Sequence, residues 1–195
     1  MPVVSAPLAA PPDAALLDRF ARGDKSALDD LFRRYRAVAY RVAYRLLGCE
    51  ADALDAVQDG FIKALTHLDR FRGHSSFKTW LLRIVSNAAF DLGRRRKREG
   101  WNDHPEPASG TGRVDLDDHP PPDFDLHRAD LRRVIEAALA RLPVVQRQTF
   151  VLHVDGELSY REVADALGVS IGTVMSRLFY ARQKLKTLLA DCVLS

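Results

Sequence analysis

The sequence predicts an all-α protein made of two small helical domains that are joined by a flexible acidic linker. Apolar residues recur every three or four positions over most of the chain, and no stretch alternates with the two-residue period of a strand. A segment rich in proline and acidic residues interrupts this pattern near the middle. The 195 residues, of which 47% are hydrophobic, are enough for two small cores.

The first helical domain is expected over residues 13–98. Residues 1–12 precede it as a disordered tail, and they lack the positive charge with which a secretory signal starts. A long amphipathic helix should follow and end at Gly48, which suits the left-handed backbone of a helix terminus. Its apolar face comprises Leu28, Leu31, Phe32, Tyr35, Val38, Val42 and Leu46.

The next helix should begin with Asp52 as its cap. Its predicted inward residues are Leu54, Val57, Phe61 and Leu65. Its other side carries Asp55, Gln58, Asp59 and Lys63. Such a stripe is most often a solvated face, and the alternative is a docking surface for a partner.

Aromatic side chains are mixed with cations between Phe71 and Arg98, and the stretch ends in the basic block RRRKR. A helix is expected here, with the inner face Phe77, Trp80 or Leu81, Ile84, Val85, Ala88 and Leu92. Buried aromatics usually belong to a core, but rings beside cations also suit unpaired nucleotides. Asn87 is either a satisfied structural amide or a group that reads a base edge.

The linker is expected over residues 99–125, where five prolines and several aspartates cannot bury enough apolar surface to order the chain. The second helical domain then covers residues 126–195. Its first helix has the periodic residues Leu131, Val134, Ile135, Ala138 and Leu142, before Pro143 interrupts it. A further helix continues over residues 145–152.

Residues 158–185 read as a helix–turn–helix. Ser159 and Glu162 have the spacing of a capping box, and the helix that follows buries Val163, Ala164 and Leu167. Gly168 suits the turn, and Ser170 can cap the second helix.

The second helix of this motif has one buried face and one face suited to DNA. Steps of four, three and four place Val174, Leu178, Ala181 and Leu185 together. The opposite face carries Gly172, Ser176, Phe179, Tyr180 and Gln183, flanked by Arg177, Arg182, Lys184 and Lys186. A helix with this surface fits a major groove, although a helical hairpin with a solvated basic face has the same pattern.

No enzyme, cofactor or metal site is expected. The chain has no glycine-rich phosphate loop and no HExxH motif, and its six histidines are scattered. Cys49 and Cys192 are expected to be ordinary thiols, with a redox role as the alternative. No apolar run approaches the roughly 20 residues of a membrane span, so no membrane insertion is expected. The net charge of +3 is small, but the cations gather in two blocks, at residues 94–98 and in the last helix.

Three motifs together resemble the extracytoplasmic-function class of bacterial sigma factors, which have only regions 2 and 4. DALDAVQDGFIKAL (residues 52–65) resembles region 2.2, and FRGHSSFKTWLLRIVSNAAFDLGRRRKR (residues 71–98) resembles regions 2.3 and 2.4. Residues 142–185 resemble region 4. The resemblance covers about residues 16–189 without the linker. It implies a bacterial alternative sigma factor that binds core RNA polymerase and directs transcription from specific promoters in a stress or envelope response.

The resemblance also implies roles for individual residues. Asp55, Gln58 and Asp59 would dock on the β′ clamp of polymerase, although the family usually has Glu where Leu54 stands. Phe71 and Asn87 would capture a flipped base of the −10 element, with Trp80, Arg94 and Arg95 contacting the same DNA. Region 4 would read the −35 element through Met175, Ser176, Arg177, Phe179 and Tyr180, and many relatives have a cation at the position of Met175. The helix–turn–helix itself would rest on Ser159, Glu162, Ala164, Gly168 and Val174.

The implied partners are core RNA polymerase, through its β′ clamp and β flap, promoter DNA, and an anti-sigma factor. Such a protein works in the cytoplasm, where an anti-sigma factor can hold it at the inner membrane. Two other classes compete with this interpretation. A free-standing helix–turn–helix regulator would need a dimer surface and palindromic sites, and it leaves the acidic helix unexplained. A sigma-like decoy usually carries a phosphoacceptor domain, which this sequence lacks.

Overall fold

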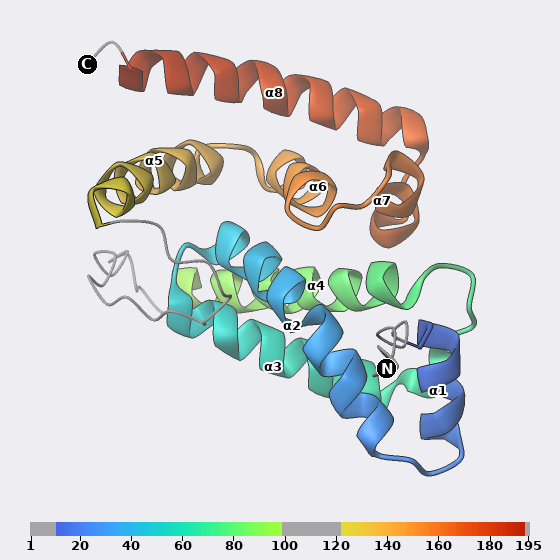
Figure 1. Cartoon of the computed structure of the whole chain (residues 1–195). Helices are drawn as coiled ribbons and strands as arrows, with labels where there is room; N and C mark the ends of the chain where they lie inside the picture. The colour runs from blue at the N-terminus through green and yellow to red at the C-terminus, as the bar shows by residue number, and fades with distance from the viewer. Residues whose placement is uncertain (1–10, 99–121, 194–195) are drawn as a thin grey trace, which may run out of the picture. The chain divides into compact units, whose positions relative to one another are not determined.

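The computed structural model describes residues 11–98 and 122–193, except for the side chains of residues 122–130 and 191–193. Regular structure in these residues is helical throughout, which confirms the all-α prediction (Figure 1). The elements are α1 (Asp13–Ala21), α2 (Ser26–Leu47), α3 (Glu50–Thr66), η1 (Leu68–Arg70), α4 (Phe77–Arg98), α5 (Pro122–Ala140), α6 (Val144–Val154), α7 (Tyr160–Leu167) and α8 (Ile171–Val193). Most of the predicted tail and linker, residues 1–10 and 99–121, lies outside the described residues.

The chain divides into two compact units, Met1–Ala37 and Val38–Ser195. The first unit contains α1 and the first half of α2, and its buried side chains include Leu16 and Leu31. Polar contacts tie these two helices together, because Asp13 accepts hydrogen bonds from both Arg34 and Tyr35. Burial, followed by the hydrogen bond to Asp13, raises the pKa of the Tyr35 phenol well above its usual range.

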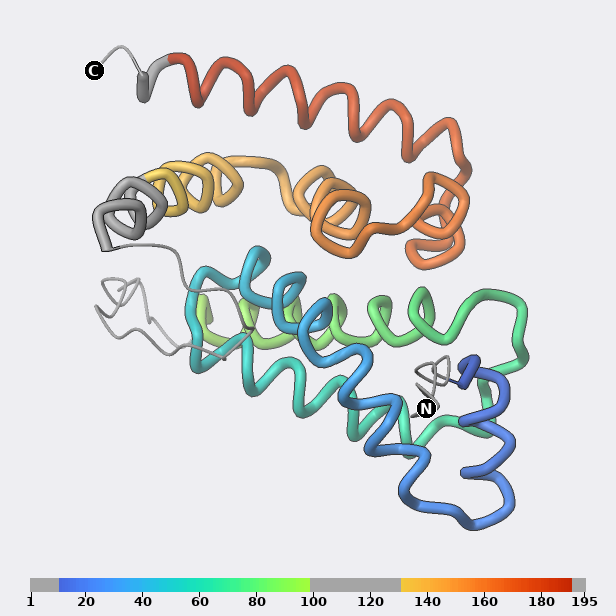
Figure 2. The backbone as a smooth tube through the Cα atoms, viewed as in Figure 1, coloured from blue at the N-terminus to red at the C-terminus, as the bar shows by residue number. Residues whose placement is uncertain are grey.

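In the second unit α3 and α4 pack side by side (Figure 2). Gly60 makes this close approach possible, because a Cβ atom there would lie 2.6 Å from Cγ2 of Val85 and 3.1 Å from its Cα. Val57 and Phe61 of α3 are buried, as are Leu81, Val85 and Ala88 of α4. Leu81 rather than the half-buried Trp80 therefore belongs to the core of α4.

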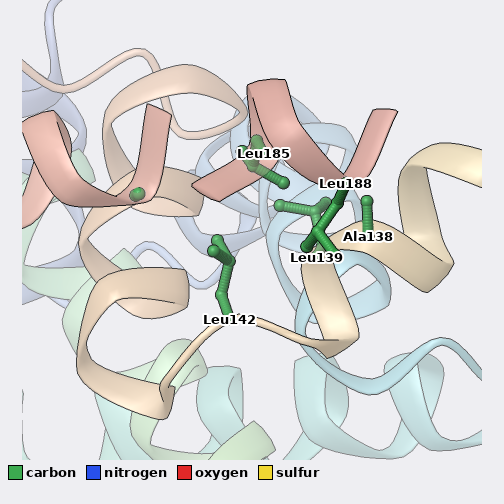
Figure 3. Packing of buried hydrophobic residues seen from close by; sticks show 6 residues of the cluster. Ala138, Leu139, Leu142, Leu185 and Leu188 are labelled. Atoms are coloured by element: carbon green, nitrogen blue, oxygen red, sulfur yellow. The ribbon is translucent and has the colours of Figure 1, made fainter. Parts of the chain in front are cut away.

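Helices α5, α6 and α7 pack against α8 in the same unit. The contact between α5 and α8 is a compact apolar cluster (Figure 3). Its buried members are Ala138, Leu139, Leu142, Ala181, Leu185 and Leu188. The expected break at Pro143 is present, since Pro143 is the N-cap of α6.

Several local predictions differ from the structure. Phe32, which was predicted on the apolar inner face of α2, is 43% exposed. Asp52 does not cap α3: the N-cap is Cys49, and Asp52 lies buried in the first turn. Leu54 is 48% exposed rather than inward, since Asp52, Ala53 and Ala56 take the buried positions around it. Leu131 is 58% exposed, because the cluster with α8 starts later on α5. Helix α5 begins at Pro122, four residues before the predicted start, since proline suits the first turn of a helix.

Candidate functional site

The corner between α7 and α8 is fixed by short-range polar contacts. Ser159 Oγ accepts a hydrogen bond from the backbone N–H of Glu162 at 3.3 Å, and the N–H of Ser159 donates to Glu162 Oε2 at 2.9 Å. The predicted capping box is therefore formed. Gly168 ends α7 with φ 64° and ψ 38°, the left-handed backbone that glycine adopts without strain. Ser170 accepts the N–H of Thr173 at 3.1 Å and starts α8.

The capping box also changes the acidity of Glu162. The hydroxyl of Ser159 and then its backbone N–H hold the pKa of the Glu162 carboxyl below its usual value of 4.5. The carboxylate is thus the form that the folded corner prefers. Ala164 and Val174 are buried behind this corner, so the five residues predicted to build the helix–turn–helix lie together.

One face of α8 is buried and the opposite face is open. Val174, Leu178 and Ala181 are almost completely buried, as the sequence predicted. The open face is formed by Met175, Phe179 and Tyr180, each 55–57% exposed, and by Ser176. The rings of Phe179 and Tyr180 meet edge to face, with centroids 5.4 Å apart. Arg177 lies at the side of this face and is half-buried.

An aromatic cluster surrounds the start of α4. The ring centroid of Phe71, in the segment between η1 and α4, lies 5.3 Å from that of Trp80 and 5.9 Å from that of Phe77. Phe77 is buried and anchors the cluster, whereas Phe71 and Trp80 are half-buried. Ser76 caps the helix, since its Oγ accepts the N–H of Thr79 at 3.1 Å. This cap was not predicted from the sequence, although Ser76 directly precedes the helix.

Asn87 lies on the same side of α4 as Trp80, because seven residues make nearly two turns. Its side chain is exposed. The rise of a helix places it about 10 Å along the axis from Trp80. The structure therefore brings Phe71 and Trp80 into contact, and it aligns Asn87 with them without contact. Arg94 is a further seven residues along this side and pairs with Asp91.

The outer face of α3 carries both charged and apolar side chains. Asp55 and Gln58 are exposed, and the half-exposed Asp59 accepts a hydrogen bond from Lys63 at 2.7 Å. Leu54 and Ile62 are 48% and 54% exposed and lie two turns apart on either side of Gln58. The exposed face is therefore less acidic than the sequence pattern indicated.

A groove of about 1030 Å³ separates the outer parts of α3 and α4. Its charged lining residues are Asp55, Asp59 and Lys63 from α3, and Asp91, Arg94, Arg95, Lys97 and Arg98 from α4. Acidic residues expected to dock a protein thus share one groove with arginines expected to bind DNA. Their proximity was not predicted from the sequence, because the two sets are about 35 positions apart.

A buried ion pair stands beside this groove. The carboxylate of Asp52, whose side chain is 5% exposed, pairs with the guanidinium of Arg96. Burial raises the pKa of the Asp52 carboxyl, and the charge of Arg96 opposes this shift. The pair joins the first turn of α3 to the last turn of α4. No local pattern of residues indicates this pair, since the partners are 44 positions apart.

Two stretches of the chain match known protein families. Residues 31–99 match sigma-70 region 2, and residues 132–185 match sigma-70 region 4. The ECF RNA polymerase sigma factor SigE of Mycolicibacterium smegmatis is 37% identical over 92% of this chain and 68% of its own length. The chain belongs to the ECF RNA polymerase sigma factors. SigW of Bacillus subtilis, another member, is 30% identical over 87% of this chain and 92% of its own.

Solved structures of sigma factors have the same fold. CnrH, in complex with the cytosolic domain of CnrY, superimposes with a TM-score of 0.68 and is 28% identical, covering 92% of this chain and 97% of its own. RpoE of Bartonella quintana, in complex with the anti-sigma factor NepR, gives a TM-score of 0.60 at 31% identity, with 83% of this chain and 97% of its own covered. The resemblance inferred from the three motifs is thereby confirmed.

Two further observations concern the described residues alone. Their histidine, cysteine, aspartate and glutamate side chains form no group that is arranged to hold a metal ion. None of their helices combines the length and the apolar character that crossing a membrane requires.

Proposed function

We propose that this sigma factor binds core RNA polymerase and directs it to specific promoters as an alternative sigma factor in a stress or envelope response. It acts as a regulator that carries polymerase to DNA, not as an enzyme. The observation that carries the proposal is the open, partly aromatic face of α8 on a helix–turn–helix within matched region 4. The proposed organisation is a tail (1–12), region 2 (13–98), a linker (99–125) and region 4 (126–195).

Polymerase docking is assigned to the outer face of α3. Asp55, Gln58 and Asp59 are accessible there and would meet the β′ clamp. Leu54 and Ile62 add apolar area to the same face, so the docked surface excludes water as well as pairing charges. Region 4 would contact the β flap.

Capture of the −10 element is assigned to the side of α4 that carries Trp80 and Asn87. Phe71 packs on Trp80 and offers a ring for stacking, while the exposed amide of Asn87 can hydrogen-bond a base edge. Arg94 and Arg95 line the neighbouring groove and would hold phosphates. The spacing of about 10 Å along the helix lets one strand touch both groups.

Reading of the −35 element is assigned to the open face of α8. Met175, Ser176, Phe179 and Tyr180 would face base edges in the major groove. Arg177 lies to the side and would hold a phosphate.

An anti-sigma factor is proposed as a further partner, and the cytoplasm as the place of action, since relatives of known structure are bound by such factors.

A promoter selection with reconstituted holoenzyme tests this function. Core polymerase with this protein should select DNA that shares two sequence elements, and core polymerase alone should select none. Ser176→Ala should change the preferred −35 sequence, because each base-edge contact contributes about 1–3 kcal/mol of discrimination. Thr187→Ala is the matched control, since Thr187 is an exposed hydroxyl on the same helix that donates to the carbonyl of Gln183.

The outcome separates the competing classes. A free-standing regulator would select palindromic duplexes without core polymerase. A decoy would select nothing in either form. A holoenzyme that enriches no sequence over core polymerase would contradict the proposed function.

A further inference from the structure

An apolar patch lies on the open face of α8. Met175, Phe179 and Tyr180 are each 55–57% exposed. The rings of Phe179 and Tyr180 meet edge to face, so they form one continuous surface. Met175 precedes Phe179 by four residues and therefore lies one turn away on the same side of the helix. We call these three residues the α8 patch.

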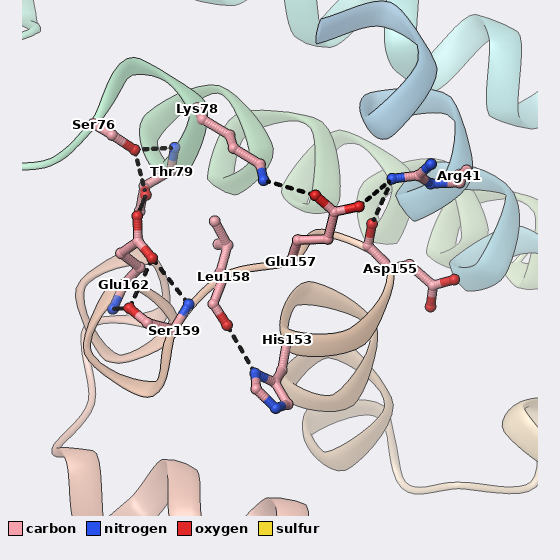
Figure 4. A network of polar contacts seen from close by, with 10 residues as sticks. All are labelled: Arg41, Ser76, Lys78, Thr79, His153, Asp155, Glu157, Leu158, Ser159 and Glu162. Atoms are coloured by element: carbon pink, nitrogen blue, oxygen red, sulfur yellow. Dashed lines mark hydrogen bonds and ion pairs between the residues drawn. The ribbon is translucent and has the colours of Figure 1, made fainter.

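The contacts that α4 and α2 make with the helix–turn–helix leave the α8 patch open. They reach α7 and the turn before it (Figure 4). Thr79 donates a hydrogen bond to Oε1 of Glu162 at 3.2 Å. Glu157 accepts hydrogen bonds from Arg41 at 2.9 Å and from Lys78 at 3.5 Å. None of these contacts involves α8, so its open face remains available to a partner.

Cations border the α8 patch on both sides. At about 100° per residue, Arg177 and Lys184 lie along one side of the open face, and Arg182 and Lys186 lie along the other. Residues 171–190 contain no acidic residue. A neutral strip between two rows of cations complements the major groove, where base edges lie between two rows of phosphates. This pattern of charge favours duplex DNA over a protein as the occupant of the patch.

The open face is poorly suited to the edge of a guanine. Guanine presents two acceptors in the major groove, N7 and O6, which arginine and lysine bind best. Met175 and Phe179 have no hydrogen-bond donor, and Tyr180 has a single hydroxyl at the far end of its ring. The hydroxyl of Ser176, next to the patch, already donates to the carbonyl of Thr173 at 3.0 Å. Its oxygen is left to accept a hydrogen bond, as from the amino group of adenine or cytosine.

Thymine is the base whose edge suits this surface. Its C5-methyl group is the apolar group that a base presents in the major groove, and the adenine paired with it presents an amino group. The α8 patch can cover the methyl group while Ser176 accepts from the adenine. A G·C pair provides no methyl group and leaves the acceptors of guanine without a charged donor.

The length of the α8 patch determines how many bases it can cover. The helical rise places Met175 and Phe179 about 6 Å apart along the axis of α8. Successive base pairs are about 3.4 Å apart along the duplex. The two side chains therefore span about two base steps, which predicts two thymines within three consecutive base pairs.

We propose that Met175, Phe179 and Tyr180 select thymine methyl groups in the −35 element, so that α8 prefers A·T pairs to G·C pairs at these positions. This inference rests on the proposed function, since it names the bases that the same face of α8 reads. Burial of one methyl group changes a binding constant by about three- to five-fold. Each thymine that the patch covers should contribute that factor.

Replacement of thymine by uracil tests the inference with the parent protein. Reconstituted holoenzyme first selects a promoter from a random library, and each thymine of its −35 element is then replaced by 2′-deoxyuridine. This change removes the methyl group and keeps the base pair. At two positions within three base pairs it should weaken binding about three- to five-fold, and between the two promoter elements it should have no effect. Equal binding of the thymine and uracil promoters, or a selected −35 element without thymine, would overturn the inference.

Alanine variants assign the effect to α8. Met175→Ala should lose the discrimination between thymine and uracil at one position, and Phe179→Ala should lose it at the other. Thr187→Ala, at an exposed hydroxyl of the same helix, is the control and should keep both. Circular dichroism verifies that the variants keep their helices. A uracil effect that persists in both patch variants would show that DNA shape is read instead. If both variants bind the promoter as tightly as the parent, the patch serves a protein partner and the inference is wrong.

A change of base preference is the sharpest form of the test. Met175→Arg should change the preferred base at one position from thymine to guanine, because a guanidinium can bind N7 and O6 together. Thr187→Arg adds the same cation twelve residues farther along α8 and should keep thymine. An unchanged preference in Met175→Arg would overturn the placement of Met175 over a base. If the parent holoenzyme selects no sequence, the proposed function fails and the inference fails with it, whereas a selected promoter that is insensitive to uracil overturns the inference alone.

Discussion

The corner between α7 and α8 and the groove between α3 and α4 both present functional side chains, but different contacts hold them. At the corner the capping contacts join residues within a few positions, Ser159 with Glu162 and Ser170 with Thr173. At the groove the fixing contacts join distant residues, Asp52 with Arg96 and Gly60 with Val85. The corner should therefore keep its conformation when contacts in other parts of the protein are removed, whereas the groove depends on the packing of α3 against α4.

The largest effect on stability is expected when the ion pair between α3 and α4 is removed. Arg96→Ala leaves the buried carboxylate of Asp52 without that cation and should destabilise the protein by about 2–3 kcal/mol in urea denaturation. Asp52→Asn should cost less, because burial already favours the neutral form of Asp52. The loss in Arg96→Ala should shrink on acidification, since protonation removes the buried charge. Equal costs for the two variants at neutral pH would show that burial does not dominate at Asp52.

A second prediction compares one substitution at two glycines of the α3–α4 pair. Gly60→Ala should destabilise the fold by about 1–3 kcal/mol, because the new Cβ meets both the side chain and the backbone of Val85. Gly93→Ala should stabilise it by about 0.5–1 kcal/mol, since its Cβ would be 3.5 Å from Leu47 and alanine favours a helix. Thermal unfolding measures both. Similar shifts at the two sites would refute the close approach at Gly60.

The third prediction concerns the capping box at the corner between α7 and α8. Ser159→Ala should cost about 1 kcal/mol, because it removes the cap of α7. The contribution of Glu162 should depend on pH: its folded pKa is depressed, so its stabilisation is full above 4.5 and is lost as pH falls through the lower folded value. The difference in melting temperature between the parent and Glu162→Gln should therefore narrow below about pH 4.5. A difference that does not change with pH would contradict the role of the carboxylate.

The smallest expected effect concerns binding rather than folding. Arg177→Ala in the holoenzyme should weaken binding nearly evenly across −35 sequences. It should also reduce the slope of the logarithm of the binding constant against the logarithm of salt concentration by about one. Lys186→Ala, at an exposed cation nine residues farther along α8, serves as the comparison. If Arg177→Ala changes the preferred −35 sequence, Arg177 contacts base edges and not phosphates.

The helix–turn–helix was predictable in detail from the sequence. Its cap, its left-handed glycine and its buried face depend on spacings of three to four residues, and the structure has all three. The outer face of α3 was predictable only in part. Asp55 and Gln58 are exposed as expected, but Leu54 is exposed too. The helical period determines which residues share one side of α3, but it does not determine how much of that side a neighbouring helix buries.

The sequence by itself determined the helices, the caps of α7 and α8, and the family, because these depend on local spacing and on motifs in a fixed order. Only the tertiary structure decided that Asp52 pairs with Arg96, that the α3 acids and the α4 arginines share a groove, and that Glu157 lies between Arg41 and Lys78. The physical reason is that charges interact through space. Residues 44 to 116 positions apart carry no mark of their partner in a single sequence.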